Sequence, residues 1–293
     1  MKMTKSYNVW SEFQPLESVA IGNINTVDEI DVPLLGQEHQ DNLSKVFEYT
    51  HSDLEKIHTQ LKKLGIKVEQ CTTYNLRSKP AYSPPLQPRD WFMVYGNTTI
   101  IPNQIHDYNH AKTKSLDHVL QENIVRGDYI DTANFLRCGR DVFYTSDYGN
   151  QGTIEGCVFM YKQLMDINPL MRLNEIKDVG SHLDGSIFFV RPGLLLSAIE
   201  YDSLPERLQS WDIIDCTVPE AQHVKSVNVW GDLFKHKHNK FHPFILEKWL
   251  WYKDTNPEET CWSINALSIN EQCVLMPGYN KYVFNELSKR KVE

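Results

Sequence analysis

Apolar residues recur along this chain as pairs of short runs, and a tight polar turn separates the two runs of each pair. The four pairs are residues 91–102, 134–145, 187–197 and 265–276. The bends carry glycine, asparagine or proline, as in Gly96-Asn97 and Pro192-Gly193. Short apolar runs joined by such residues are typical of β-hairpins. The pattern therefore predicts four hairpins.

Segments with a helical period lie between the hairpins or follow them. In residues 41–64 the apolar side chains recur at three-to-four spacing, and Gly65 directly after them is a typical helix stop. Shorter helices are predicted at residues 153–165, 205–211 and 279–288. Another short strand pattern follows the earlier helices, for example at residues 66–69. The chain therefore repeats a unit of hairpin, helix and strand.

These units predict an α/β fold with mixed sheets, because a hairpin is antiparallel whereas a helical crossover joins parallel strands. A doubly wound sheet is the alternative, but a pseudo-symmetric ring of four or five ββαβ units explains the repetition better. Residues 1–293 contain no Pro-, Gly- or Ser-rich linker and are predicted to form a single domain. The segment 218–261 breaks the spacing and is interpreted as an insertion.

Composition narrows the possible partners. The chain has 38 acidic and 30 basic residues, a formal net charge of −8, and it therefore lacks the charge balance of an electrostatic nucleic-acid binder. No apolar run is long enough to span a bilayer, and the first residues lack the apolar core of a signal peptide. The six cysteines form no CxxC pair, which suits reduced thiols. We therefore expect a cytoplasmic protein with no nucleic-acid or membrane partner.

Four ionisable side chains stand at repeated positions, each beside the start of a predicted hairpin. They are Asp90, Asp131, His182 and Asp184. In a ring of units the starts of equivalent hairpins converge on the central axis, so these side chains are expected to face one pocket. His182 and Asp184 are expected to point to the same side of a strand, because they lie two residues apart. Taken singly, an Asp at such a position is usually a turn cap and a His is usually structural. Together, three carboxylates and an imidazole favour a cationic guest.

Other sequence patterns give no cofactor site. Neither the P-loop nor the dinucleotide-binding glycine motif occurs. His236, His238 and His242 are close enough in sequence for a zinc site, but no Cys or Asp stands at ligand spacing beside them. A solvated loop is therefore the favoured interpretation of this histidine segment. We expect no metal and no organic cofactor.

The strings around these four residues resemble motifs of the amidinotransferases, the family of glycine amidinotransferase and inosamine-phosphate amidinotransferase. The first three strings are similar to P-R-D…G-N, D-A-A-D-F-x-R-x-G-R-D and H-I-D…P-G, and the fourth matches the asparagine of S-M-N. In this chain they are Pro88-Arg89-Asp90 with Gly96-Asn97, residues 131–141, His182-Leu183-Asp184 with Pro192-Gly193, and Asn265. Outside the predicted insertion, the resemblance extends from about residue 16 to the end of the chain.

The resemblance implies a five-bladed α/β propeller of ββαβ modules, the last of them incomplete. It implies transfer of the amidino group of L-arginine to an amine acceptor such as glycine, which yields guanidinoacetate. Asp131 and His182 would then be the acid–base members of a Cys-His-Asp triad, and Asp90 and Asp184 would bind the guanidinium. The reaction proceeds through a covalent amidino-cysteine, needs no cofactor and has small molecules as its only required partners.

The chain departs from the family in three places. The family's nucleophile lies in a G-G-x-H-C string that this sequence does not contain. Cys138 and Cys273 are interpreted as structural thiols, so we expect the chain alone to be inactive or very weakly active. Activity would need a complementing C-terminal segment, supplied by a longer gene product or a second chain. A homo-oligomer is the other protein partner that stays open. Tyr201 stands near the position of the arginine that binds the donor's carboxylate. Glu258-Glu259 stands near the position of a serine pair.

Two other functions stay open at this point. One is a guanidino-compound hydrolase, similar to arginine deiminase or dimethylargininase, in which water replaces the amine acceptor and citrulline is released. The other is a non-catalytic protein that keeps the acidic pocket and binds guanidino compounds. The missing cysteine string and Tyr201 favour the second of these alternatives.

Overall fold

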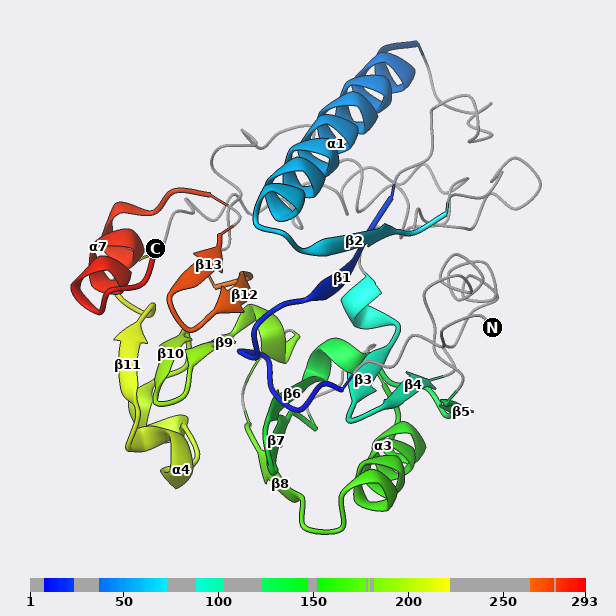
Figure 1. Ribbon diagram of the computed structural model, residues 1–293, viewed down its shortest axis with the longest axis vertical. Coiled ribbons are helices and arrows are strands. Elements are labelled where there is room, and N and C mark those ends of the chain that lie inside the picture. Colours follow the sequence, from blue (N-terminus) through cyan, green and yellow to red (C-terminus); the bar gives the residue numbers. More distant parts are fainter. Residues whose placement is uncertain are drawn as a thin grey trace.

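The structure is a computed structural model that describes residues 8–23, 37–72, 88–102, 123–146, 152–177, 179, 182–221, 264–276 and 278–293. Side chains are described within these ranges except for residues 37–47. The described part of the chain folds into five small β-sheets with helices between their strands, a mixed α/β arrangement (Figure 1). The mixed α/β class predicted from the sequence is confirmed.

Three sheets share one plan, in which an antiparallel hairpin is extended by a third strand that runs parallel to the second hairpin strand. The first sheet consists of β3 (Met93–Tyr95), β4 (Thr98–Pro102) and β5 (Ile124–Gly127). The second consists of β6 (Phe135–Cys138), β7 (Asp141–Tyr144) and β8 (Arg172–Glu175). The third consists of β9 (Ile187–Arg191), β10 (Leu194–Ser197) and β11 (Asp212–Asp215).

The other two sheets have two strands each. In one, β1 (Ser18–Ile21) pairs in parallel with β2 (Lys67–Gln70), and helix α1 (Gln37–Lys63) joins them. In the other, β12 (Leu267–Asn270) and β13 (Cys273–Leu275) form a hairpin. All four predicted hairpins are therefore present. The strands β1 and β5 were not predicted, because neither carries a strong alternating pattern.

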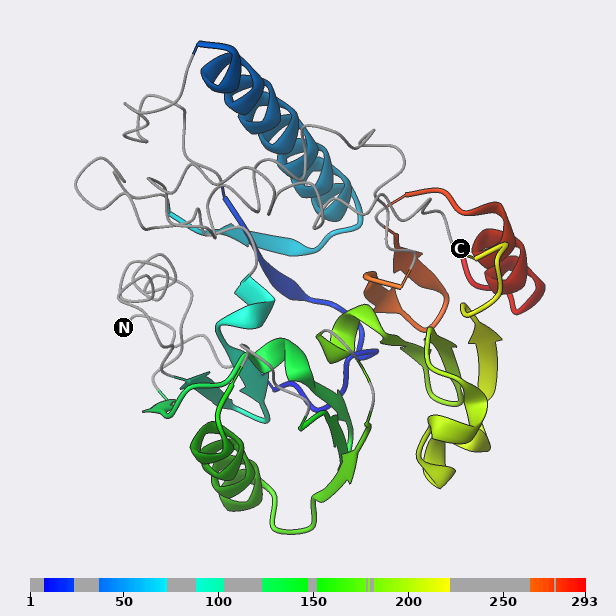
Figure 2. The same ribbon diagram turned by 180° about the vertical axis from the view of Figure 1, so that it is seen from behind.

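Helices connect the strands of the repeated units. Helix α3 (Ile154–Ile167) joins β7 to β8, the short α4 (Glu206–Gln209) joins β10 to β11, and α7 (Lys281–Lys289) follows β13. The four predicted helices are therefore confirmed to within a few residues. These helices lie at the periphery of the molecule in both views (Figures 1 and 2).

Local signals explain where the elements end. Gly65 follows α1 with a φ of 79°, and the amides of Gly65 and Ile66 bond to the carbonyls of Lys62 and Leu61. This is the Schellman arrangement, which terminates a helix at a residue that tolerates the left-handed region. Gly193 has the same φ at the turn between β9 and β10, where a residue with a Cβ would be strained.

Helices α3 and α7 each bury an apolar face against strands of the sheets. Helix α3 places Met160 and Leu164 in a cluster with Tyr95 and Phe135, and all four side chains are fully buried. Helix α7 contributes Val283 to a second cluster with residues of β9, β10 and β11. Removal of this apolar surface from water is the main force that holds each unit together.

The N-terminal segment, residues 8–16, runs past three of the hairpins and bonds to each. Val9 forms a bridge with Gly96, Ser11 forms one with Cys138, and the amide of Leu16 bonds to the carbonyl of Ile269 at 2.8 Å. The hydrophobic pattern of the sequence gave no sign of this path. The segment therefore connects separate sheets through backbone hydrogen bonds.

A short 3₁₀ turn precedes each of three hairpins: η2 (Pro88–Asp90), η3 (Thr132–Asn134) and η4 (Leu183–Gly185). The prediction that His182 and Asp184 lie on one strand is wrong. His182 precedes η4 and Asp184 lies inside it. The chain turns here because the amide of Gly185 donates a hydrogen bond to the carbonyl of His182 at 3.2 Å. In both views the three turns lie towards the middle of the molecule (Figures 1 and 2).

Some predictions fall on residues that the structure does not describe. Most of the predicted insertion and the histidine segment lie within 222–263, outside the described ranges. The single domain over residues 1–293 stays a prediction for the same reason. Among the helices in the described ranges, none combines the length and the hydropathy needed to cross a membrane.

Candidate functional site

The three 3₁₀ turns that carry the predicted site residues are joined directly by hydrogen bonds. Asn134, fully buried at the end of η3, accepts a hydrogen bond from the amide of Leu183 at 3.3 Å. Arg89 in η2 donates to the carbonyl oxygens of Thr132 at 3.2 Å and Phe135 at 2.5 Å. These bonds bring together segments that lie more than forty residues apart in the sequence.

His182 and Asp131 form a hydrogen-bonded pair at the junction of η3 and η4. The distance from Nε2 of His182 to Oδ2 of Asp131 is 3.1 Å. The side chains are 29% and 16% exposed, so the pair is shielded but reachable from solvent. A carboxylate that holds one ring nitrogen fixes the orientation of the imidazole.

The surroundings of His182 favour its charged form. Burial lowers the pKa of His182, but the hydrogen bond to Asp131 and the negative charge of Asp90 outweigh that effect, with further contributions from the charges of Asp131 and Asp184. The net result is a raised pKa for the imidazole. Opposite charges within a few ångströms stabilise the protonated form in this way. His182 can therefore donate a proton at higher pH than an isolated histidine.

Asp184 lies next to an arginine of the protein itself. Its Oδ2 is 3.7 Å from Nε of Arg89. Burial raises the pKa of Asp184 more than the positive charges of Arg89 and His182 lower it. This carboxylate is therefore costly to ionise without a cation beside it.

Asp90 is placed in the same group by its electrostatic effects. Its charge raises the pKa of both His182 and Tyr129. The structure therefore brings Asp90, Asp131, His182 and Asp184 together, although their functional roles remain predictions.

Tyr129 is a residue of this group that sequence reasoning missed. Burial and the charges of Asp131 and Asp90 raise the pKa of its phenol. Ile130, which is fully buried, separates Tyr129 from Asp131, so the two side chains lie on the same side of an extended segment. An apolar residue flanked by two polar ones was the available sequence signal.

Glu12 and Arg137 form a second layer beside Arg89. Arg137 donates to both carboxylate oxygens of Glu12, at 2.8 Å and 2.7 Å, and Nη2 of Arg89 lies 3.5 Å from the same carboxylate. Burial raises the pKa of Glu12, but the positive charges of Arg137 and Arg89 more than reverse that effect and hold the pKa at about 2. No local motif marks Glu12, because its partners lie far away in the sequence.

The charges of this group do not cancel. The four carboxylates of Glu12, Asp90, Asp131 and Asp184 face the guanidinium groups of Arg89 and Arg137 and a single imidazole. With all four carboxylates ionised, the group has an excess of negative charge whether His182 is neutral or protonated. An excess of this sign favours a cationic ligand.

None of the five cysteines in the described ranges is in a disulfide, and their surroundings are poorly suited to a thiolate. Burial, assisted by nearby carboxylates, raises the pKa of Cys138 and Cys216 to about 12, and it also raises that of Cys273. Cys71 is buried, and Cys157 packs against an apolar cluster. Deprotonation of a thiol requires a more polar or more positively charged environment than these.

Tyr201, which departs from the family pattern, and Asn265, which matches it, both lie at the surface. The hydroxyl of Tyr201, 53% exposed, donates to the carbonyl of Gln209 at 3.1 Å. Asn265 is also exposed. Within the described ranges, no group of three metal-binding side chains forms a candidate metal site.

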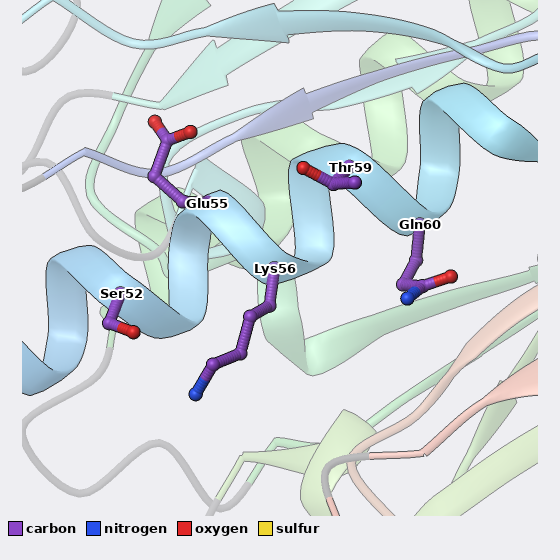
Figure 3. A pocket seen from close by; sticks show the side chains of 5 residues that line it. All are labelled: Ser52, Glu55, Lys56, Thr59 and Gln60. Atoms are coloured by element: carbon purple, nitrogen blue, oxygen red, sulfur yellow. The ribbon is translucent and has the colours of Figure 1, made fainter.

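A depression of about 300 Å³ lies on the exposed face of α1 (Figure 3). It is lined by Ser52, Glu55, Lys56, Thr59 and Gln60. Lys56 pairs there with Asp53 at 2.8 Å, and both side chains are well exposed. Exposed pairs of this kind are weak, so nothing here resembles a built binding site.

Comparisons with known proteins define the fold. No protein-family model matches this sequence. No curated protein matches it either. Among solved structures, the amidinotransferase SxtG from Microseira wollei, of the saxitoxin biosynthetic pathway, matches 98% of this chain and 90% of its own, with a TM-score of 0.65 at 18% identity.

Two other solved structures match a similar share of this chain. The inosamine-phosphate amidinotransferase StrB1 from Streptomyces griseus has a TM-score of 0.68 at 16% identity, over 99% of this chain and 90% of its own. DDAH from Pseudomonas aeruginosa, solved with citrulline, has a TM-score of 0.62 at 13% identity, over 95% of this chain and 91% of its own. The chain therefore has the fold shared by amidinotransferases and this hydrolase. The resemblance recognised in the sequence motifs is confirmed at the level of the fold.

Proposed function

We propose that this chain binds the guanidinium group of L-arginine or a related compound and takes part in amidino transfer to an amine such as glycine. The main support is the hydrogen-bonded pair of His182 and Asp131, 3.1 Å apart, with Asp90 and Asp184 beside it. The order of these residues in the sequence and the shared fold with amidinotransferases support the same proposal.

Carboxylates are the natural partners of a guanidinium. The guanidinium is a planar fork of five donors, and its bonds to carboxylates are charge-assisted and frequently bidentate. Asp90 and Asp184 are assigned to bind this fork. Asp184 is suited to the role because burial makes its ionised form costly, and a cationic ligand removes that cost.

Amidino transfer takes place in two half-reactions. In the first, a thiolate attacks the central guanidinium carbon, the bond to the leaving amine breaks, and His182 gives that amine a proton. In the second, His182 takes a proton from the incoming amine, which attacks the amidino-cysteine and releases the thiolate. Asp131 keeps the imidazole oriented through both steps. The raised pKa of His182 suits its first role, as the acid.

The nucleophile of this route is not assigned to any described cysteine. The thiols of Cys138, Cys216 and Cys273 have raised pKa values, so they are held in the protonated form. Because the sequence also lacks the G-G-x-H-C string, the covalent step is assigned to a cysteine supplied by a second chain.

The test is a product assay with arginine labelled in its guanidino carbon, in the presence and absence of glycine. Together with a second chain that carries the cysteine, transfer predicts labelled guanidinoacetate and unlabelled ornithine in equal amounts, only when glycine is present. The chain by itself is expected to form neither product. The control is His182→Gln, which keeps a polar side chain and is expected to abolish the product. Labelled citrulline that forms without glycine would instead establish a hydrolase.

A non-catalytic guanidino-binding protein is the second candidate, and the buried, protonated thiols favour it. It predicts saturable binding of arginine with no product, even after long incubation. Absence of both binding and product would contradict both candidates.

We also propose that the five sheets are the blades of a five-bladed α/β propeller. Three of them repeat the same hairpin-plus-parallel-strand plan, and 3₁₀ turns precede equivalent hairpins, which supports this arrangement. A crystal structure tests the proposal: the sheets should close into a ring, with the three turns around its axis.

A further inference from the structure

Arg89 contacts several groups of the candidate site itself, both backbone carbonyls and carboxylates. Binding of a substrate cation does not require these contacts. Arg89 precedes Asp90 in η2, and its guanidinium donates to the carbonyls of Thr132 and Phe135 at either end of η3. In return, the hydroxyl of Thr132 donates to the carbonyl of Arg89. The turns that carry Asp90 and Asp131 are therefore fastened to each other in both directions.

The guanidinium of Arg89 also faces two carboxylates. Its Nε lies 3.7 Å from Oδ2 of Asp184, and its Nη2 lies 3.5 Å from Oε1 of Glu12. The first distance is too long for a good hydrogen bond but short enough for a strong charge interaction. The positive charge of Arg89 therefore stabilises the ionised carboxylate of Asp184, but Arg89 makes no good hydrogen bond to its Oδ2.

We propose that Arg89 is the positioning residue of this site, which fastens η2 to η3 and supplies Asp184 with a permanent neighbouring positive charge. This inference deepens the proposed function. Only its benefit to a bound guanidinium rests on that function. Glu12, itself held by Arg137, limits how strongly Arg89 engages Asp184.

Arginine is suited to this role and lysine is not. A planar guanidinium can bond to two carbonyls while its other edge faces carboxylates, whereas an ammonium is a point charge at the end of a flexible chain. Arg89→Lys therefore separates the two functions, because it keeps the charge near Asp184 and loses the bridge between η2 and η3.

The charged groups that face Asp184 predict opposite effects for two substitutions. Arg89 and His182 lower the pKa of this carboxyl, whereas Glu12 raises it together with burial. Loss of the Arg89 charge should make Asp184 harder to ionise. Loss of the Glu12 charge should make Asp184 easier to ionise.

The experiment is a carbon-detected NMR titration of the Asp184 carboxyl in the full chain without ligand. In Arg89→Gln the midpoint is expected to rise by about one pH unit or more. In Glu12→Gln it is expected to fall. The matched control is Arg290→Gln: Arg290 is 22% exposed and makes two bonds to Asp212, at 2.7 Å and 2.8 Å, in another unit of the fold. That variant should leave the Asp184 midpoint unchanged.

An unchanged midpoint in a folded Arg89→Gln protein would overturn the proposal. If Arg89→Gln does not fold, Glu12→Gln and Arg89→Lys decide instead. Arg89→Lys should keep the Asp184 midpoint close to that of the unsubstituted protein but lower the free energy of unfolding. Undiminished stability in Arg89→Lys would refute the fastening role. An unmoved Asp184 midpoint in Glu12→Gln would refute the charge role. Because no ligand is present, failure to bind arginine would count against the proposed function and not against this inference.

Discussion

At the scale of single residues, the site consists of charged groups whose charged forms are destabilised by burial and stabilised by neighbouring opposite charges. His182 is buried enough to lose basicity, yet the carboxylates around it raise its pKa. Asp184 remains harder to ionise than an exposed aspartate. A pair of neighbouring groups whose pKa values are both shifted by their surroundings is typical of sites that bind ions or move protons.

The first prediction concerns the pair of His182 and Asp131. Asp131→Asn removes the charge and keeps the shape, so the pKa of His182 should fall by about one unit or more. An NMR titration of the ring signals, assigned with His182→Gln, measures this shift. Asp53→Asn on the exposed face of α1 is the control and should leave the titration unchanged. An Asp131→Asn titration identical to that of the unsubstituted protein would mean that the hydrogen bond has no electrostatic role.

The second prediction concerns the acid limb of stability. The folded-state pKa of Glu12 is about 2, below its ordinary value of 4.5, so its ion pairs stabilise the protein above pH 4.5 and are lost as pH falls towards 2. Glu12→Gln should lower the free energy of unfolding at pH 7 by about 1.5–3 kcal/mol. Denaturant unfolding at several pH values measures both effects. The variant should lose less stability than the unsubstituted protein on acidification; an equal loss would contradict this account of Glu12.

At the scale of elements, the segment before each hairpin positions the functional side chains. The carbonyl of Tyr129 accepts bonds from the amide and the hydroxyl of Thr153, which caps α3, at 3.0 Å and 3.1 Å. The same hydroxyl accepts a bond from the amide of Gly156 at 3.0 Å. The start of α3 therefore fixes the backbone two residues before Asp131.

The third prediction tests this link. A Cβ added at Gly156 would lie 2.0 Å from the carbonyl oxygen of Tyr129, a backbone atom that cannot move alone. Gly156→Ala should therefore lower the free energy of unfolding by about 1–3 kcal/mol, as overpacking does, and lower the pKa of His182 by displacing Asp131. Denaturant unfolding and the histidine titration measure the two effects. Glu155→Ala, at the exposed neighbouring position, should change neither, and an unaltered pKa in Gly156→Ala would refute the link.

The hairpins and helices could be predicted from the sequence because their signals are local. A glycine turn between two apolar runs gave the hairpin at Gly193, and three-to-four spacing with a terminal Gly65 gave α1. The 3₁₀ turns were missed, since three residues are too few for a periodic pattern. The error at His182 and Asp184 followed from this, because a strand was assumed where the chain turns.

At the scale of the whole molecule, non-local contacts complete the site. The N-terminal segment bonds to three hairpins, and Glu12 reaches Arg137 and Arg89 from there. The sequence grouped Asp90, Asp131, His182 and Asp184 through their repeated positions. It could not reveal Glu12, whose partner Arg137 lies 125 residues away, because distant ion pairs leave no local pattern.

The fourth prediction concerns this N-terminal segment. The ring of Trp10 packs edge-on against Tyr95, with centroids 5.1 Å apart, and lies directly against Gly96. Trp10→Ala should lower the free energy of unfolding by about 3 kcal/mol through the cavity it leaves. The control is Phe284→Ala, which removes an aromatic side chain that is 51% exposed and should cost much less. Equal stability losses in thermal or denaturant unfolding would show that the segment is not part of the core.

The most direct test of a guanidinium site beside His182 is an NMR titration that follows the His182 ring signals as L-arginine is added. The account predicts a saturable shift of these signals with arginine, a much weaker one with ornithine, which lacks the guanidinium, and weakened binding in Asp184→Asn. Signals that do not move with arginine, or that move equally with ornithine and in Asp184→Asn, would contradict it.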